Sequence, residues 1–226
     1  SLWSDLNMTT KAADGYVRNG QTSALKNLNP VSVTDSNEFK ELRTIYDRLI
    51  QVGPNGDLVP WAATSIKAVD NTTVDITLRE GMRFHDGKPV TIEDVKFTFD
   101  YCKKWEAPFF ISSLKKFQEI TITGKNTMRI KLSEPHAPLM INFFAQIFIL
   151  PKHVWENIPG SSGVDDVLNY DNPNPIGSGP FKFDYWDRGK ELKVSAFQDH
   201  FSAPKCAGMI RITYGSHDAM AAAIEA

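Results

Sequence analysis

Hydrophobic and polar residues alternate strictly along residues 74–79. This period of two predicts a strand with one buried face. Asp86-Gly87 then predicts a tight turn, because glycine adopts a positive φ at little cost. Residues 92–105 carry two apolar stripes at helical spacing, and Thr91 with Asp94 three residues later has the form of a capping box. Because the apolar arc is wide, we expect this helix to pack on two sides.

A similar pattern of alternation occurs twice in the middle of the chain. Residues 65–80 read SIKAVDNTTVDITLRE, and residues 119–134 read EITITGKNTMRIKLSE. Each segment alternates, passes through a short polar turn and alternates again, which is typical of a hairpin. The two hairpins predict one small antiparallel sheet, with the helix at 92–105 packed across its buried face.

The periodicity also predicts elements on either side. Residues 38–51 carry apolar side chains at three- and four-residue steps, which indicates a helix. Residues 181–196 predict a third hairpin, residues 210–214 predict a strand, and Ser216 is placed to cap a final helix over 218–226. Between them we expect a helix at 138–144, a buried strand at 147–150, a short helix beginning at 151–154 and a loop over 159–175.

Residues 174–181 form a distinctive motif, NPIGSGPF. Two glycines and two prolines in eight residues predict a rigid chain crossing with close backbone approach. A phosphate loop is excluded, because no Gly-Lys-Ser/Thr follows and no helix opens there.

Several of these motifs resemble those of a known family. Residues 78–97 fit the pattern L-R-x-G-x-x-F-x-D-G-x-P-x-T-x-x-D-V-x-F, and residues 174–181 fit N-P-[IV]-G-[TS]-G-P-[YF]. Shorter matches are Y-[DE]-x-L-[IV] at 46–50 and W-x-x-G at 186–189. The chain therefore resembles the extracellular solute-binding proteins of family 5, the peptide- and nickel-binding receptors of ABC importers.

The resemblance implies a fold and a division into domains. It implies a mixed α/β fold: a periplasmic-binding-protein-like type II lobe with an inserted α+β subdomain of antiparallel hairpins and helices. Residues 1–50 plus 172–226 would form the main lobe, and residues 51–171 the inserted subdomain. Family members continue through a second lobe, so the resemblance implies an N-terminal lobe fragment here. We expect residues 1–226 alone to bind ligand weakly or not at all.

The resemblance also implies a function. Such a protein is the substrate-binding component of an ABC importer. It holds an oligopeptide, or a nickel chelate, sugar or opine, between two lobes and delivers it to a membrane permease. This implies a monomeric protein, periplasmic or lipid-anchored at the cell surface, that is not an enzyme and needs no cofactor. The alternative is an interaction or sensory domain that keeps this fold without transport.

Two segments are the candidate ligand contacts that the resemblance implies. The first is the small polar loop Thr34, Asp35, Ser36 and Asn37, which precedes the helix predicted at 38–51. The same loop also reads as an ordinary N-cap, with Asp35 or Ser36 as the capping residue. The second is the pair Phe109 and Phe110, which follows the proline that ends the helix at 92–105. Packing in the subdomain's core explains this pair equally well.

Composition and charge exclude other classes. The net charge is -2 with both signs interspersed, which lacks the basic stripe of a nucleic-acid-binding protein. The longest apolar run, 139–150, is interrupted by Asn142 and Gln146 and is too short to span a bilayer. The first residue is not Met, and no leader pattern opens the chain. Of the two cysteines, Cys102 lies on an apolar helix face, so a buried free thiol is favoured over a disulfide with Cys206.

The sequence offers little catalytic chemistry. Its five histidines include no pair at the spacing of a zinc-binding helix, and there is no G-x-S-x-G nucleophile elbow. We interpret His85-Asp86 as a solvated pair in a turn. A hydrolase is therefore the least favoured class.

Overall fold

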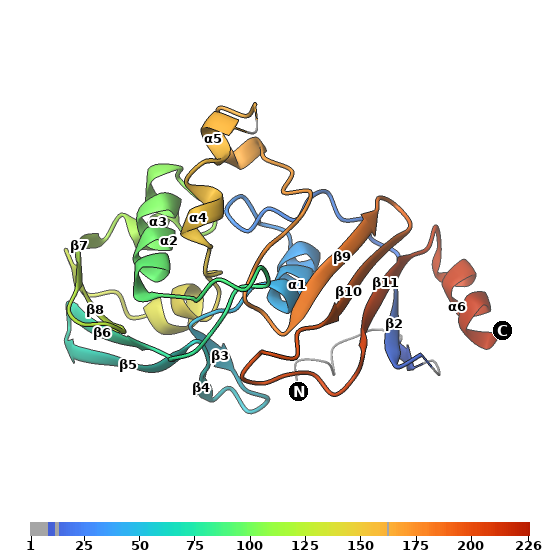
Figure 1. Ribbon diagram of the computed structural model, residues 1–226, viewed down its shortest axis with the longest axis horizontal. Coiled ribbons are helices and arrows are strands. Elements are labelled where there is room, and N and C mark those ends of the chain that lie inside the picture. Colours follow the sequence, from blue (N-terminus) through green and yellow to red (C-terminus); the bar gives the residue numbers. More distant parts are fainter. Residues whose placement is uncertain (1–8, 12–13, 162) are drawn as a thin grey trace.

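The structure is a computed structural model that describes residues 9–11, 14–161 and 163–226 (Figure 1). Its larger sheet has five strands in the order β1-β2-β11-β10-β9. The strands are β1 (Thr9–Lys11), β2 (Tyr16–Gln21), β9 (Phe181–Asp187), β10 (Glu191–Ala196) and β11 (Gly208–Thr213). β2 and β11 pair in parallel, while the other neighbours are antiparallel. The predicted third hairpin is therefore confirmed, and the last strand ends close to its predicted limit.

The smaller sheet has four strands in the order β5-β6-β8-β7. They are β5 (Ala63–Asp70), β6 (Thr73–Leu78), β7 (Phe117–Ile122) and β8 (Thr127–Leu132), all paired antiparallel. Alternate residues of β6 and β8 are buried, including Ile76, Met128 and Ile130. The prediction that two hairpins form one antiparallel sheet is confirmed.

Helix α2 (Ile92–Lys104) packs against this sheet and begins as the sequence predicts. The carboxylate of Asp94 accepts hydrogen bonds from the backbone N–H (2.8 Å) and the hydroxyl (3.0 Å) of Thr91. Beyond the helix end, Glu106 is left-handed with φ of 53°, and the N–H of Ala107 donates to the carbonyl of Cys102. Cys102 is a buried free thiol and Cys206 is also free, as expected.

Helix α1 (Ser36–Ile45) lies between the two sheets and is shorter than predicted (Figure 1). The prediction of a helix to residue 51 is wrong, because the backbone turns extended at Tyr46 and residues 50–52 form β3 (Ile50–Val52). There the chain pairs with β4 (Leu58–Pro60). Apolar spacing continues past the helix end because Tyr46, Leu49 and Ile50 are buried although they lie outside the helix.

The remaining elements are short. They are α3 (Ile111–Leu114), the π-helical turn η1 (Met140–Phe144), α4 (Lys152–Trp155), α5 (Ile158–Ser161), η2 (Val167–Asn169) and α6 (His217–Glu225). The hydroxyl of Ser216 caps α6 by accepting from the N–H of Ala219 at 3.0 Å. The buried strand predicted at 147–150 is wrong, because this segment makes a single bridge, Phe148 to Arg48, instead of joining a sheet. Its N–H groups at Ile149 and Leu150 donate to the Asp47 carbonyl and the Thr98 hydroxyl.

Buried apolar side chains from both sheets belong to one continuous hydrophobic cluster. The five-stranded sheet draws its strands from residues 9–21 and 181–213, and the four-stranded sheet draws its strands from residues 63–132. The domain boundaries at 50 and 172 stay a prediction. No helix in the described ranges has both the length and the apolar character that crossing a bilayer requires.

Candidate functional site

The loop Thr34–Asn37 forms the start of α1. The Oδ1 atom of Asp35 accepts from the N–H groups of Asn37 (2.8 Å) and Glu38 (3.3 Å), so Asp35 is the N-cap. The side chains of Thr34, Asp35 and Ser36 are exposed and that of Asn37 is half-buried. The loop therefore caps the helix and also presents polar groups to the surface.

Phe109 and Phe110 differ in exposure. Phe110 is 1% exposed and belongs to the core, whereas Phe109 is 42% exposed. Both rings contact Phe39, which lies in the first turn of α1, with centroid distances of 4.8 Å for Phe109 and 6.3 Å for Phe110. The structure thus brings Phe109 to the same end of α1 as the polar loop.

Arg43 and Gln146 lie near this surface, and the sequence analysis named neither as a candidate ligand contact. Arg43 lies one turn beyond Phe39 on α1, with its guanidinium carbon 5.7 Å from the Phe39 ring centroid. Its Nη2 donates to Oε1 of Gln146 at 2.9 Å. Burial lowers the pKa of Arg43 from its ordinary value. The helical spacing of Phe39 and Arg43 was the available signal, but a lone arginine on an amphipathic helix usually reads as solvated.

A buried polar network joins the two sheets, and Asp47 is its centre. The Asp47 carboxylate accepts from Nε2 of His200 (2.8 Å), Nε1 of Trp61 (2.9 Å) and the hydroxyl of Ser178 (2.9 Å). The sequence analysis included Asp47 only as the acidic position of the motif at 46–50 and gave it no role. We name Asp47, Trp61, Ser178 and His200 the joint network.

The joint network has the residue types of a serine hydrolase triad without its geometry. In such a triad the histidine lies between the serine and the carboxylate. Here the Asp47 carboxylate lies between Ser178 and His200 and accepts from both, so Ser178 has no histidine base among the described residues. All three residues are also buried. This arrangement fits a structural role.

His85 corrects the interpretation of His85-Asp86 as a solvated pair. His85 is only 6% exposed, and its Nε2 is 2.9 Å from the carbonyl oxygen of Gly179. Its Nδ1 accepts from the N–H of Gly177 at 3.4 Å, which assigns the proton to Nε2. Burial lowers the pKa of His85 to about 4. His85 therefore holds the crossing at 177–179 as a neutral ring, while Asp86 pairs separately with His153.

One serine–histidine contact does occur, between Ser113 Oγ and His136 Nε2 at 3.0 Å. The Nδ1 atom of His136 faces the ammonium group of Lys116 at 3.1 Å. An ammonium can only donate, so Nδ1 is the acceptor and Nε2 of the neutral ring carries the proton. A protonated Nε2 cannot remove the proton of Ser113, which argues against this pair as a nucleophile and base.

Metal and cavity chemistry is equally sparse. Among residues 9–11, 14–161 and 163–226, no group of three or more His, Cys, Asp or Glu side chains is placed to hold a metal ion. A cavity of about 40 Å³ beside the joint network is lined by Met82, Ser178 and His200 among others. A small-molecule site usually has a volume of about 300–1,000 Å³, so this cavity has room only for water. The open surface around Phe109 and the polar loop is the better candidate site.

Comparison with a known family agrees with the sequence motifs. Residues 57–226 match the model of a protein family described as "Bacterial extracellular solute-binding proteins, family 5 Middle". Members of that family are solute-binding proteins.

Individual relatives are similar over part of their length. The oligopeptide-binding protein AppA of Bacillus subtilis is 34% identical over 146 residues, which cover 62% of this chain and 26% of that protein. The crystal structure of AppA with a nonapeptide has a TM-score of 0.78 and 25% identity, covering 91% of this chain and 41% of that one. NikZ of Campylobacter jejuni, in complex with Ni(L-His), has a TM-score of 0.82 and 22% identity, covering 95% of this chain and 42% of that one. The chain thus spans less than half the length of these relatives, and its mixed α/β fold is that of periplasmic binding proteins.

Proposed function

This chain belongs to the bacterial extracellular solute-binding proteins of family 5, and we propose that it supplies one lobe of an ABC importer's substrate-binding component. The lobe would bind an oligopeptide or a similar small solute against a second lobe and deliver it to a membrane permease. The mechanism is binding and release without turnover. Similarity to AppA and to the peptide complex of DppA from Helicobacter pylori favours a peptide over the other solutes of the family.

The proposed main lobe comprises residues 1–50 plus 172–226, and the proposed inserted subdomain comprises residues 51–171. In support, the five-stranded sheet uses strands from the two ends of the chain, and the four-stranded sheet uses only the middle. The joint network and His85 hold the places where the chain passes between them. A rigid lobe of this kind can close on a second lobe by a hinge movement.

The observation that carries the site is the position of two predicted segments at one end of α1. We propose that Thr34, Asp35, Ser36 and Asn37 face the solute, with Phe109 beside them and Phe110 supporting its ring at 5.1 Å. Exposed backbone near the loop can pair with an extended peptide, as an added strand does. Water between side chains would let such a site accept varied peptides.

The proposed cellular setting follows from the family. Its members act outside the cytoplasm, and we propose a monomer that is either periplasmic or lipid-anchored at the cell surface. The proposed partner is the permease of an ABC importer.

Calorimetry on the full-length protein tests this proposal. Titration with tri-alanine and with a nonapeptide of mixed sequence should give micromolar or tighter binding. Phe109→Ala should weaken the binding about tenfold, because an exposed aromatic anchor loses its contact with the ligand. Tyr185→Ala is the matched control, since Tyr185 is 43% exposed on β9 and Phe109 is 42% exposed.

The control should bind as the unchanged protein does. If the two variants lose the same amount of peptide affinity, the proposal that the site lies at the end of α1 is wrong. If no peptide binds and a peptide ester is hydrolysed, the receptor function is overturned.

A further inference from the structure

Arg43 has an incomplete set of hydrogen-bond partners. Its Nη2 is held by Gln146, but its Nε is buried and has no hydrogen-bond partner among the described residues. A buried donor without a partner costs about 1–3 kcal/mol, and more when the group is charged. Such a group in a native protein calls for an explanation, and a bound ligand is one.

No carboxylate lies within ion-pair distance of Arg43 in the described part of the chain. The buried arginine Arg211, by contrast, pairs with Glu41 at 3.1 Å. Arginine keeps its charge at any physiological pH, so it cannot relieve its burial by losing a proton. Its unbalanced positive charge therefore favours an anion.

A second guanidinium strengthens the local positive charge. Arg48 is 7% exposed and donates to the carbonyl oxygen of Ala145 at 3.2 Å, next to Gln146. The nearest acid in sequence, Asp47, is already occupied by the three donors of the joint network. Burial, and then the positive charge of Arg43, lower the pKa of Arg48 to about 10.

The position of Arg43 connects it to the proposed site. Phe39 lies between them, since it contacts the Phe109 ring at 4.8 Å and lies under the Arg43 guanidinium. Residues 39 and 43 are four apart on α1 and so share one face of the helix. The distance along the helix from Asp35 to Arg43 is about 12 Å, which is the length of three or four extended residues.

We propose that Arg43, oriented by Gln146, binds a carboxylate of the solute, and this inference rests on the function proposed above. The free Nε–H and the guanidinium protons not used by Gln146 would donate to the two carboxylate oxygens. A planar guanidinium matches a carboxylate in this way better than a lysine ammonium does. The preferred solute is then a short peptide whose terminal or side-chain carboxylate reaches Arg43.

Matched peptide pairs test the proposal on the full-length protein. One pair is tri-alanine and its C-terminal amide, and the other is Ala-Glu-Ala and Ala-Gln-Ala. We expect the unchanged protein to bind the carboxylate member of at least one pair about tenfold more tightly. Arg43→Met keeps the apolar stem and should bring this ratio to about 1, while Arg43→Lys should leave an intermediate ratio.

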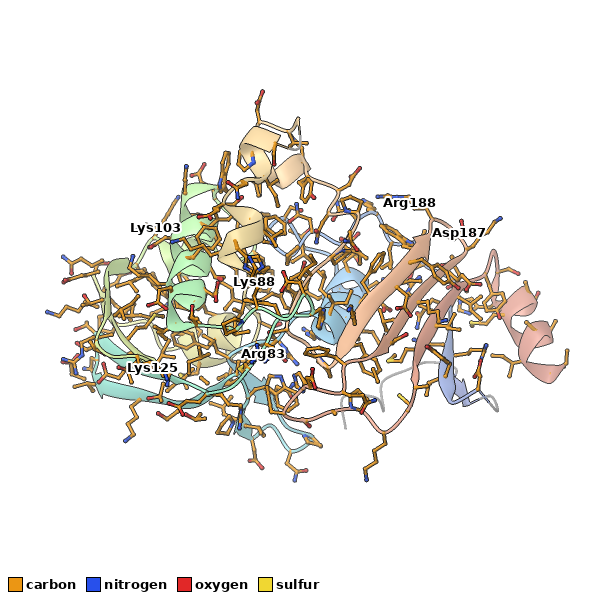
Figure 2. The ribbon with its side chains drawn as sticks, viewed as in Figure 1. Arg83, Lys88, Lys103, Lys125, Asp187 and Arg188 are labelled. Carbon is orange, nitrogen blue, oxygen red and sulfur yellow. The ribbon has the colours of Figure 1, made fainter. Side chains whose placement is uncertain are left out.

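Arg188→Met is the control, because Figure 2 shows Arg188 at the tip of the β9–β10 hairpin, where it donates to the carbonyl of Lys26. That variant should keep the full ratio. If the peptides bind and Arg43→Met keeps the ratio, the carboxylate site is overturned and the receptor function stands. If no peptide binds the unchanged protein, a peptide is not the solute, and the carboxylate site is overturned with it.

Discussion

The four-stranded sheet with α2 and the joint between the two sheets are stabilised in different ways. Strands β5 and β6, like β7 and β8, are neighbours in sequence, and alternate side chains of β6 and β8 are apolar and buried. The joint depends on polar contacts between distant residues, such as Asp47 with His200 and Asp47 with Ser178. Its glycines also allow the backbone of 177–179 to approach Ile45 closely.

The difference shows which interactions position the proposed site. The sheet with α2 carries Phe109 on the segment after α2, whereas the joint holds the chain just beyond α1, at Asp47, against Ser178 and His200. Damage to the joint should therefore alter both stability and ligand binding. Damage to a surface feature of the four-stranded sheet should affect little beyond local stability.

Asp47→Ala should have the largest effect. It removes the acceptor of the buried Ser178 and His200 side chains and of the partly buried Trp61 indole, and each buried donor left unpaired costs about 1–3 kcal/mol. Denaturant unfolding measures the loss. Asp86→Ala breaks the more exposed pair with His153 and should cost less than about 1 kcal/mol. Equal costs for the two variants would contradict the role given to the joint.

Gly179→Ala should have the next largest effect and lower the free energy of unfolding by about 3 kcal/mol. A Cβ atom at Gly179 would lie 2.5 Å from the backbone carbon of Ile45, and backbone cannot swing aside as a side chain can. Gly160→Ala is the control, because a Cβ there meets nothing within 4 Å and its φ needs no glycine. Thermal unfolding of both variants makes the comparison, and a neutral Gly179→Ala would show that the crossing is loose.

His85 should make the joint sensitive to acid. Its pKa is lowered from 6.5 to about 4 by burial, so the unfolded chain binds a proton at a higher pH than the folded chain does. Stability is fully present above pH 6.5 and is lost as the pH falls toward 4, by about 2 kcal/mol between pH 7 and pH 5. Urea titrations at both pH values, on the unchanged protein and on His85→Asn, measure the contribution. An identical pH dependence in the two proteins would show that His85 is not buried as a neutral ring.

Asp94→Ala tests the start of α2 and should cost about 1 kcal/mol. Asp94 accepts from the Thr91 N–H and also from the N–H of Lys152 at 3.0 Å, so the loss extends to the start of α4. Glu93→Ala changes an exposed acid in the same turn and should lower the free energy of unfolding by only about 0.3 kcal/mol, the size of a surface helix-dipole effect. Denaturant unfolding that ranks Glu93→Ala above Asp94→Ala would contradict the cap.

The smallest effect should come from Asp75 and Arg129, which pair across β6 and β8 at 2.7 Å. Both side chains are about two-fifths exposed, at 40% and 43%, so a double-mutant cycle should give a coupling of about 0.5 kcal/mol. The coupling should shrink in 1 M salt, roughly a 3 Å screening length. A coupling that exceeds the cost of Asp94→Ala would reverse the order proposed for this region.

The sequence predicted the four-stranded sheet well because its signals are local. Alternation fixes the buried face of each strand, and Thr91 with Asp94 marks the start of α2. The end of α1 was missed because the buried residues Leu49 and Ile50 continue the helical spacing although they lie beyond the helix. There tertiary contacts override the local pattern.

The candidate site was predicted only in part. An N-cap pattern located the loop at 34–37, and the proline after α2 located Phe109. The proximity of these segments depends on Phe39, which no local pattern relates to residue 109. The roles of Arg43 and Asp47 were missed for the same reason, since their partners Gln146, Ser178 and His200 lie about a hundred residues or more away.

Hydrogen exchange on the full-length protein, with and without saturating tri-alanine, tests the central claim most directly. If the outer end of α1 is one wall of the solute site, amides in segment 33–39 and around Phe109 should exchange at least about tenfold more slowly with the peptide bound. Amides at the joint should change little, because they are already buried. Protection that leaves both segments unchanged and appears instead at the exposed β3–β4 hairpin would contradict the account.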